Sequence, residues 1–212
     1  MEIHRQHFQE THDLNSLEHF NKFYLEEKYP AVSGSLVNFF KTVVHERIPN
    51  VDVKILELGC GSRSLFEDLE FKYKNIAAID FSEVAIEKAP QHSGIIYKVV
   101  DLTAPFALGD MSFDLIFDSH CLHCIEGTND RKTALENIRE ALTADGLFCA
   151  EMMVQPSKGF AYLPLKHIPK ALELEEELLA SGFKINYFMI SKSMVFHNEN
   201  GECELLRVVC RK

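Results

Sequence analysis

Short apolar runs alternate with helix-like stretches along most of this chain of 212 residues, and this alternation constrains its fold more than any other feature. Continuous runs of Val, Ile, Leu and Phe predict buried strands, because a parallel sheet is covered on both faces. Five such runs span residues 53–58, 75–80, 95–99, 113–118 and 147–152. Strands separated by helices predict an α/β protein, in which a mostly parallel sheet carries helices on both faces.

The segments between these runs carry helix signals. Ser82 is a good N-cap for a helix over residues 83–89, and a short helix is expected at 65–71. A longer helix should end at residues 144–146, where a glycine follows its last periodic position. Its apolar face is formed by Ala134, Leu135, Ile138, Ala141 and Leu142.

The last part of the chain has a different connection. A helix is expected at residues 169–181 and a strand at 183–190, followed by a polar turn at 197–202 and a strand at 205–210. Since only this last connection resembles a hairpin, we expect the final strand to be antiparallel, added at the edge of the sheet. The fold predicted is a doubly wound α/β sheet of about seven strands.

About fifty residues precede the sheet, with helical stretches at 14–27 and 33–46. Ligands of open α/β folds bind at the carboxyl ends of the strands, where an N-terminal extension could form a roof. Packing of both helices against the sheet is the alternative. Because no linker-like composition divides the chain, we expect one compact unit at 51–212 and a helical extension or cap at 1–50.

Composition limits the partners and the location. The net charge is −10 with no basic cluster, which argues against a nucleic-acid partner, because phosphate contacts dominate such binding. The N-terminus lacks the pattern of a secretory signal, and the chain has no run of about 18 apolar residues. We therefore expect a cytoplasmic protein outside the membrane, with its six cysteines reduced.

A glycine turn follows the first strand, in the segment ILELGCGSRSLF at residues 55–66. Gly59 and Gly61 allow positive φ and leave room for a ligand against the backbone. A tight turn without a ligand is the simplest alternative. A phosphate-binding loop is excluded, because the lysine and hydroxyl that should follow the glycines are absent. A dinucleotide fingerprint is weakened, because Ser64 replaces its third glycine.

The acidic residue and glycines of ILELGCG resemble the first motif of class I S-adenosylmethionine-dependent methyltransferases. The resemblance extends through most of residues 53–212, with further matches in AAIDFS, VVDLTAPF and FDLIFDSHCLHCI and in the antiparallel seventh strand. It implies a Rossmann-like fold with S-adenosylmethionine as the cofactor and S-adenosylhomocysteine as its product.

The matched positions suggest roles in holding that cofactor. Asp80, 21 residues beyond Gly59, is expected to accept both ribose hydroxyls. Phe81 is expected to pack on the adenine and Asp101 to accept from its amino group, while Glu57 orders the loop or reaches the amino end of the methionine moiety. The cofactor site expected from the motifs consists of Glu57, Gly59, Cys60, Gly61, Asp80, Phe81, Asp101, Leu102 and Asp118.

The residues after the fourth strand, DSHCLHCI at 118–125, should face the reacting methyl group. Methyl transfer is an in-line displacement that needs alignment and, for some acceptors, removal of a proton. His120 or His123 could act as the general base or as a hydrogen-bond acceptor for the substrate, or both could simply pack the loop. We favour His120, because it is nearer the end of the strand.

The same segment contains the spacings His-x-x-His and Cys-x-x-Cys, which are found in metal-binding and redox sites and could also bind a metalloid substrate. Since the chain has no second Cys-x-x-Cys pair, we expect packing cysteines and no metal site. The substrate wall is expected to include Tyr24, Tyr29, Cys121 and Met152.

Three functions remain open within this resemblance. The first is methyl transfer to an N, O or S nucleophile of a small molecule. The second is protein methylation, because NIAAIDFSEVAIEKA is similar to part of the protein-lysine methyltransferases that modify translation factors, although DSHCLHC departs from their sequence. The third is non-catalytic binding of S-adenosylmethionine. A dehydrogenase is the remaining option outside the family.

Overall fold

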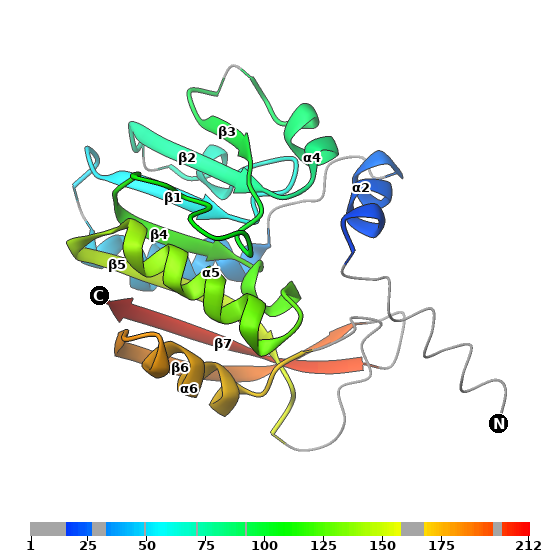
Figure 1. Cartoon of the computed structure of the whole chain (residues 1–212), viewed down its shortest axis with the longest axis vertical. Coiled ribbons are helices and arrows are strands. Elements are labelled where there is room, and N and C mark those ends of the chain that lie inside the picture. The colour runs from blue at the N-terminus through cyan, green and yellow to red at the C-terminus, as the bar shows by residue number, and fades with distance from the viewer. Residues whose placement is uncertain are drawn as a thin grey trace, which may run out of the picture.

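The computed structural model describes residues 16–26, 33–48, 50–70, 72–91, 93–157, 168–196 and 201–212, with the backbone alone for 192–196 and 201–202. In this part of the chain seven strands form one sheet, in the order β3-β2-β1-β4-β5-β7-β6 (Figure 1). They are β1 (Lys54–Leu58), β2 (Asn75–Asp80), β3 (Ile96–Val99), β4 (Phe113–Ser119), β5 (Leu142–Val154), β6 (Lys184–Phe196) and β7 (Gly201–Arg211). The first five are parallel, and β7 is antiparallel to both its neighbours. The predicted Rossmann-like sheet is confirmed.

Strand β7 is an interior strand, so the predicted edge position was wrong. It lies between β5 and β6, and β6 forms the edge. Five of the six residues at 205–210 are buried, whereas Ile190 of β6 is 43 % exposed. A hairpin places its two strands side by side but does not decide which of them pairs with the rest of the sheet and which forms the edge. The more continuous apolar run at 205–210 is the one that needs cover on both faces.

The sheet has its switch point at β1, which pairs with β2 on one side and with β4 on the other. Leu58 is in register with Ile79 of β2 and with Asp118 of β4. The carboxyl ends of these three strands therefore lie at one level. Ligands of open α/β sheets bind at this kind of crevice.

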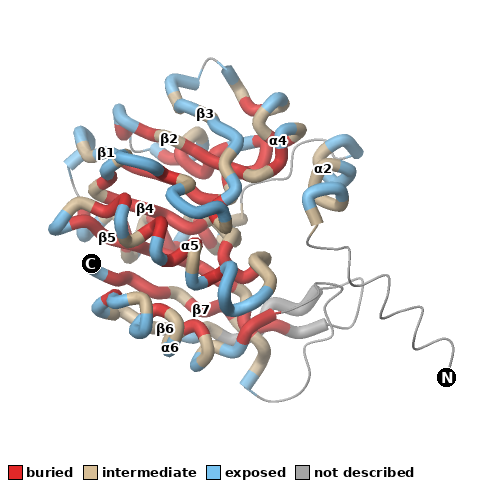
Figure 2. The backbone as a smooth tube through the Cα atoms, viewed as in Figure 1, coloured by how far each residue is buried: buried red, intermediate tan, exposed pale blue. Residues whose placement is uncertain are grey.

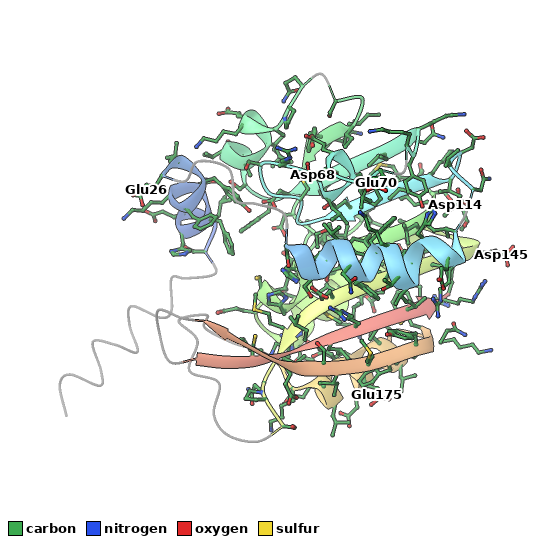
Figure 3. All side chains as sticks on the ribbon, turned by 180° about the vertical axis from the view of Figure 1, so that it is seen from behind. Glu26, Asp68, Glu70, Asp114, Asp145 and Glu175 are labelled. Carbon is green, nitrogen blue, oxygen red and sulfur yellow. The ribbon has the colours of Figure 1, made fainter. Side chains whose placement is uncertain are left out.

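Helices cover both faces of the sheet. On one face lie α5 (Thr128–Ala141) and α6 (Ala171–Ala180), as Figure 1 shows. On the opposite face, seen in Figure 3, lies α3 (Gly34–Phe39), continued by a π-helical turn (Phe40–Val44) and a 3₁₀ turn (His45–Arg47). The strands between these layers are largely buried (Figure 2). The largest fully buried side chains of the core include Phe39, Phe40, Phe117, Phe148, Ile55 and Leu56.

Three helix predictions have different outcomes. Helix α4 (Glu83–Lys88) begins as expected, with the Ser82 hydroxyl accepting from the Ala85 N–H at 3.1 Å. The short helix predicted at 65–71 is only a 3₁₀ turn (Leu65–Glu67). Helix α5 ends at Ala141 and not at 144–146, because the chain becomes extended at the next residue and pairs with β4.

The two N-terminal helical stretches have separate positions. Helix α2 (Leu17–Glu26) lies beside α4 (Figure 1), where the Ser82 hydroxyl contacts the Asn21 side chain at 2.5 Å and Lys88 donates to carbonyl oxygens near the end of α2. Helix α3 packs on the sheet through buried Leu36 and Phe39. Helix α2 therefore lies over the crevice, while α3 packs mainly on the sheet and reaches the smaller cavity through Leu36.

Candidate active site

Two adjoining cavities lie at the carboxyl ends of β1, β2 and β4. The larger, of about 520 Å³, includes Asp80 and Asp101 in its wall, and the smaller, of about 220 Å³, lies over the glycine turn. The first volume is in the range of small-molecule sites. Four residues line both cavities and mark where they meet: Tyr24, Gly59, Ser119 and His120.

The glycine turn has the backbone that its sequence predicts. Gly59 and Gly61 have φ of +67° and +58°, in the left-handed region that favours glycine. A Cβ atom at Gly59 would lie 2.7 Å from Cys121 Cβ, and one at Gly61 would lie 2.8 Å from the Tyr24 hydroxyl oxygen. Conformation therefore favours glycine at both positions, and at Gly59 the nearby Cys121 Cβ and Cα leave no room for a side chain. Cys60, between the two glycines, is buried and lines the smaller cavity.

Asp80 connects the end of β2 to the glycine turn. Its Oδ2 accepts from the Gly61 N–H at 2.9 Å, and its Oδ1 accepts from the Ser82 N–H at 3.0 Å. Burial raises the pKa of Asp80, and these backbone donors oppose the shift. Each carboxylate oxygen can accept further hydrogen bonds, so Asp80 can still bind hydroxyl groups in the larger cavity that it lines.

The adenine side of the expected site is also assembled. Phe81, Asp101 and Leu102, three of the residues expected to hold the cofactor, all line the larger cavity. Phe81 also meets Phe20 of α2 edge to face, with ring centroids 5.3 Å apart. Asp101 Oδ1 accepts from the backbone and hydroxyl of Thr103 at 2.9 and 2.7 Å, which fixes the direction of the carboxylate.

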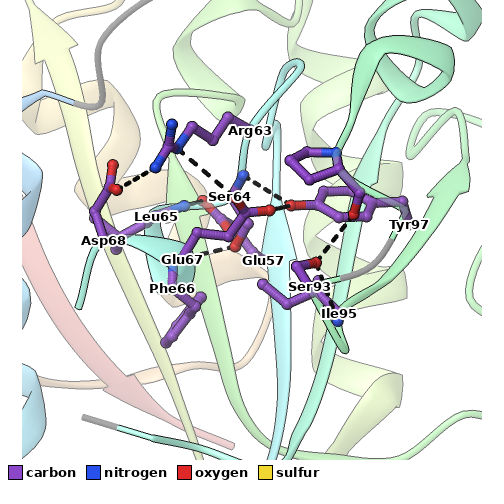
Figure 4. Close-up of polar contacts among 11 residues, drawn as sticks. Glu57, Arg63, Ser64, Leu65, Phe66, Glu67, Asp68, Ser93, Ile95 and Tyr97 are labelled. Atoms are coloured by element: carbon purple, nitrogen blue, oxygen red, sulfur yellow. Dashed lines mark hydrogen bonds and ion pairs between the residues drawn. The ribbon is translucent and has the colours of Figure 1, made fainter. Parts of the chain in front are cut away.

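Glu57 forms hydrogen bonds with the residues that follow the glycine turn, and Figure 4 draws it with Ser64 and Leu65. Its Oε1 accepts from the Leu65 N–H at 3.1 Å and from the Ser119 hydroxyl at 2.7 Å, and its Oε2 accepts from the Ser64 hydroxyl. Burial raises the pKa of Glu57 to about 7, although these three donors oppose the shift. Glu57 also lines the smaller cavity, so it can order the loop and contact a ligand at the same time.

His120 has an unusual backbone at the junction of the cavities. Its φ of +69° is in the left-handed region, which is uncommon for residues other than glycine. The side chain is 19 % exposed, and its Nε2 lies 3.0 Å from Glu151 Oε1. Of the two candidate histidines, this is the one that reaches the cavities.

His123 lies behind this loop and lines neither cavity. It is 2 % exposed, and its ring nitrogens have no hydrogen-bond partner among the described residues. Burial lowers the pKa of His123 to about 3, so the ring is neutral at physiological pH.

Other predicted site residues also lie away from the cavities. Asp118 is buried and accepts from the N–H groups of Cys121 and Leu122 at 2.6 and 3.1 Å, so it shapes the loop that carries His120. Met152 is fully buried in the core. Tyr29 lies outside the described residues.

The thiols at the larger cavity are protonated. Burial raises the pKa of Cys124 to about 12 and that of Cys121 well above its ordinary value. Both residues line the cavity, as does Tyr24, whose hydroxyl pKa is also raised by burial. Among the described residues, no group of three or more His, Cys, Asp or Glu side chains is arranged to hold a metal ion.

Several polar residues of the site were not found from the sequence. Glu151 is the one charged residue in the apolar run at 147–154, and such an isolated charge could have been recognised as needing a partner. Ser64 and Ser119 gave no comparable signal, because serines are common at strand ends and turns.

No helix in the described ranges combines the length and the hydrophobicity needed to cross a bilayer.

Comparison with known proteins agrees with this geometry. Residues 56–150 match the family model described as a methyltransferase domain, which covers β1 to β5 and the glycine turn. The comparison with curated protein sequences found no match.

Solved structures share the fold at low sequence identity. An S-adenosylmethionine-dependent methyltransferase from Methanosarcina mazei has a TM-score of 0.65 at 19 % identity, over 81 % of this chain and 97 % of that one. One from Clostridium acetobutylicum has 0.65 at 16 %, over 85 % and 92 %. The 1,6-didemethyltoxoflavin-N1-methyltransferase of Burkholderia thailandensis, with 1,6-didemethyltoxoflavin and S-adenosylhomocysteine bound, has 0.63 at 18 %, over 97 % and 87 %. Its matched domain and its fold therefore make this chain similar to the S-adenosylmethionine-dependent methyltransferases.

Proposed function

We propose that the chain transfers the methyl group of S-adenosylmethionine to an N, O or S nucleophile of a small molecule, with His120 as the general base. The position of His120 carries this proposal, because this residue lines both the larger cavity and the cavity over the glycine turn. Residues 51–212 would form the catalytic unit, and the 1–50 extension would contribute α2 as part of its roof.

The residues present fit this cofactor. Asp80 would accept from the ribose hydroxyls, Phe81 would pack on the adenine, and Asp101 would accept from its amino group. Glu57 would face the amino end of the methionine moiety from the smaller cavity. Bound S-adenosylmethionine supplies an electrophilic methyl group on a positively charged sulfur, and a wall with several carboxylates suits a cationic molecule.

His120 would accept the proton that the nucleophile loses, since imidazole is the side chain best suited to proton transfer near neutral pH. Cys121 and Cys124 would remain protonated and would shape the wall, because burial raises the pKa of both thiols. Tyr24 would offer a neutral hydroxyl to the acceptor from α2.

A small acceptor is supported by the cavity of about 520 Å³ that α2 partly lines and by the similar Burkholderia enzyme, whose structure contains the small molecule 1,6-didemethyltoxoflavin. The test uses cofactor with a labelled methyl group, supplied with a metabolite pool and, separately, with total lysate protein. Label in small molecules supports the proposal. Label confined to protein would contradict the small-molecule acceptor, and binding of S-adenosylhomocysteine without transfer to either pool would contradict catalysis.

Asp80→Ala should weaken the binding of S-adenosylhomocysteine by about 10- to 150-fold. The ribose hydroxyls lose a charged acceptor, and hydrogen bonds to charged groups contribute about 1.5–3 kcal/mol. Isothermal titration calorimetry measures the change. Asp145→Ala is the control, because that carboxylate is exposed at the amino end of β5, far from the cavities (Figure 3). Unchanged affinity in a folded Asp80 variant would contradict the assignment of this residue.

A further inference from the structure

A buried carboxylate contacts His120 from outside the cavities. Glu151 is fully buried in the middle of β5. Its Oε1 lies 3.0 Å from His120 Nε2, and its Oε2 accepts from Arg207 Nε at 2.6 Å and from the Ser35 hydroxyl at 2.8 Å. A buried charge is costly unless it is paired and hydrogen-bonded. Here both carboxylate oxygens have partners, and one of these partners is the proposed base.

The surroundings of Glu151 keep it ionised. Arg207 is in register with Glu151 on the neighbouring strand β7, and its Nη2 also donates to Ser35 Oγ at 2.7 Å. Burial by itself would raise the pKa of Glu151, but hydrogen bonds from His120, Arg207 and Ser35 lower it overall. An ionised carboxylate can only accept hydrogen bonds.

We propose that Glu151 is a positioning residue that holds His120 in the tautomer with its proton on Nε2, so that Nδ1 receives the proton of the methyl acceptor. The inference rests on the proposed role of His120. Because Glu151 only accepts, the 3.0 Å contact requires an N–H group at Nε2. During transfer the acceptor's proton moves to Nδ1, its lone pair bonds the methyl carbon, and the electron pair of the broken carbon–sulfur bond stays on sulfur.

The backbone of His120 supports the same role. Its φ of +69° stores strain that persists only where the surrounding structure imposes it. Asp118 imposes it from one side, by binding the N–H groups of the next two residues. Glu151 holds the ring from the other side. Both the position and the tautomer of the imidazole are therefore defined before any ligand binds.

The wild-type chain allows a direct test that needs no substrate. Two-dimensional ¹H–¹⁵N NMR of the imidazole rings distinguishes the two tautomers, and a His120→Asn sample assigns the signal. At a pH high enough for the ring to be neutral, we expect the proton on Nε2. A neutral ring with its proton on Nδ1 would overturn the proposal.

Glu151→Gln should reverse the tautomer. Arg207 and Ser35 both donate to Oε2, so the glutamine carbonyl oxygen should occupy that place and turn its NH₂ group towards His120. Nε2 must then accept, which moves the ring proton to Nδ1. With an acceptor identified in the labelling screen, kcat should fall by about 100-fold or more, because the base no longer presents a free Nδ1. KM and the affinity for S-adenosylhomocysteine should change by less than about threefold.

The matched control is Glu177→Gln. Glu177 forms a partly buried ion pair with Arg131 between α5 and α6, at 2.7 and 2.8 Å, and lines neither cavity. This variant loses a comparable carboxylate but should keep the wild-type tautomer and kcat. An Nδ1–H tautomer in Glu151→Gln with unchanged kcat would overturn the positioning role. Absence of methyl transfer by the wild-type chain would instead contradict the proposed function. The NMR result would still show whether His120 Nε2 carries the proton that Glu151 accepts.

Discussion

Glu57→Gln should make the apoprotein more stable than the wild type above pH 7, by up to about 3 kcal/mol, and equally stable at low pH. Burial raises the pKa of Glu57 from 4.5 to about 7. A carboxyl group whose pKa is raised in the folded state binds its proton more tightly in the folded protein than in the unfolded chain. Its contribution to stability is therefore complete below pH 4.5 and is lost as the pH rises to about 7. A shift of this size corresponds to about 3 kcal/mol.

Glutamine can occupy this position and keep the contacts to Leu65, Ser64 and Ser119. Its carbonyl oxygen can take the place of Oε1, which accepts from the Leu65 N–H and the Ser119 hydroxyl. Its NH₂ group can take the place of Oε2 and donate to Ser64 Oγ, because a hydroxyl group can exchange its donor and acceptor roles. The substitution thus removes the titration while keeping the network that holds the turn.

Urea denaturation at a series of pH values measures the difference in unfolding free energy between wild type and variant. Asp118, whose pKa burial raises to about 6, is present in both proteins and cancels in the difference. Glu70→Gln is the control, because its side chain is 85 % exposed and should give a flat difference. Parallel pH profiles for wild type and Glu57→Gln would show that the buried carboxyl group is not the source of this dependence.

Much of the fold could be predicted from local patterns. Strands β1, β2, β4 and β5 are rich in apolar residues because both of their faces are covered, and Ser82 marked the start of α4. The placement of β7 inside the sheet could not be predicted in the same way. Either strand of the final hairpin, β6 or β7, could have paired with β5. The strand whose two faces are both covered, β7, takes that place, and the hairpin connection alone does not reveal this.

The grouping of the residues expected to hold the cofactor was predictable for a topological reason. Parallel strands end at the same edge of a sheet, so Gly59, Asp80 and Asp101 had to meet if the strands were correctly placed. The group around the proposed base was not predictable. Glu151 is 31 residues from His120 and 56 from Arg207, and Ser35 is 172 from Arg207, so no local spacing connects them.

His120→Asn should lower kcat by about 10²- to 10⁴-fold, the usual contribution of a general base. Asparagine is preferable to alanine here, because it tolerates the left-handed backbone that His120 adopts at φ +69°. The amide cannot take up a proton, so the nucleophile must lose its proton to water. The affinity for S-adenosylhomocysteine should stay within about threefold of the wild type, because the expected cofactor contacts come from other residues.

Steady-state kinetics with the acceptor from the labelling screen, together with calorimetry, separates these two effects. His45→Asn is the matched control, because His45 hydrogen-bonds Tyr73 at 2.7 Å and lines neither cavity. If His120→Asn keeps the wild-type kcat, the acceptor reaches the methyl group already deprotonated and the imidazole only shapes the cavity. If kcat falls while the affinity for S-adenosylhomocysteine is unchanged, the loss lies in the transfer step. This result supports His120 as the group that takes the proton of the methyl acceptor.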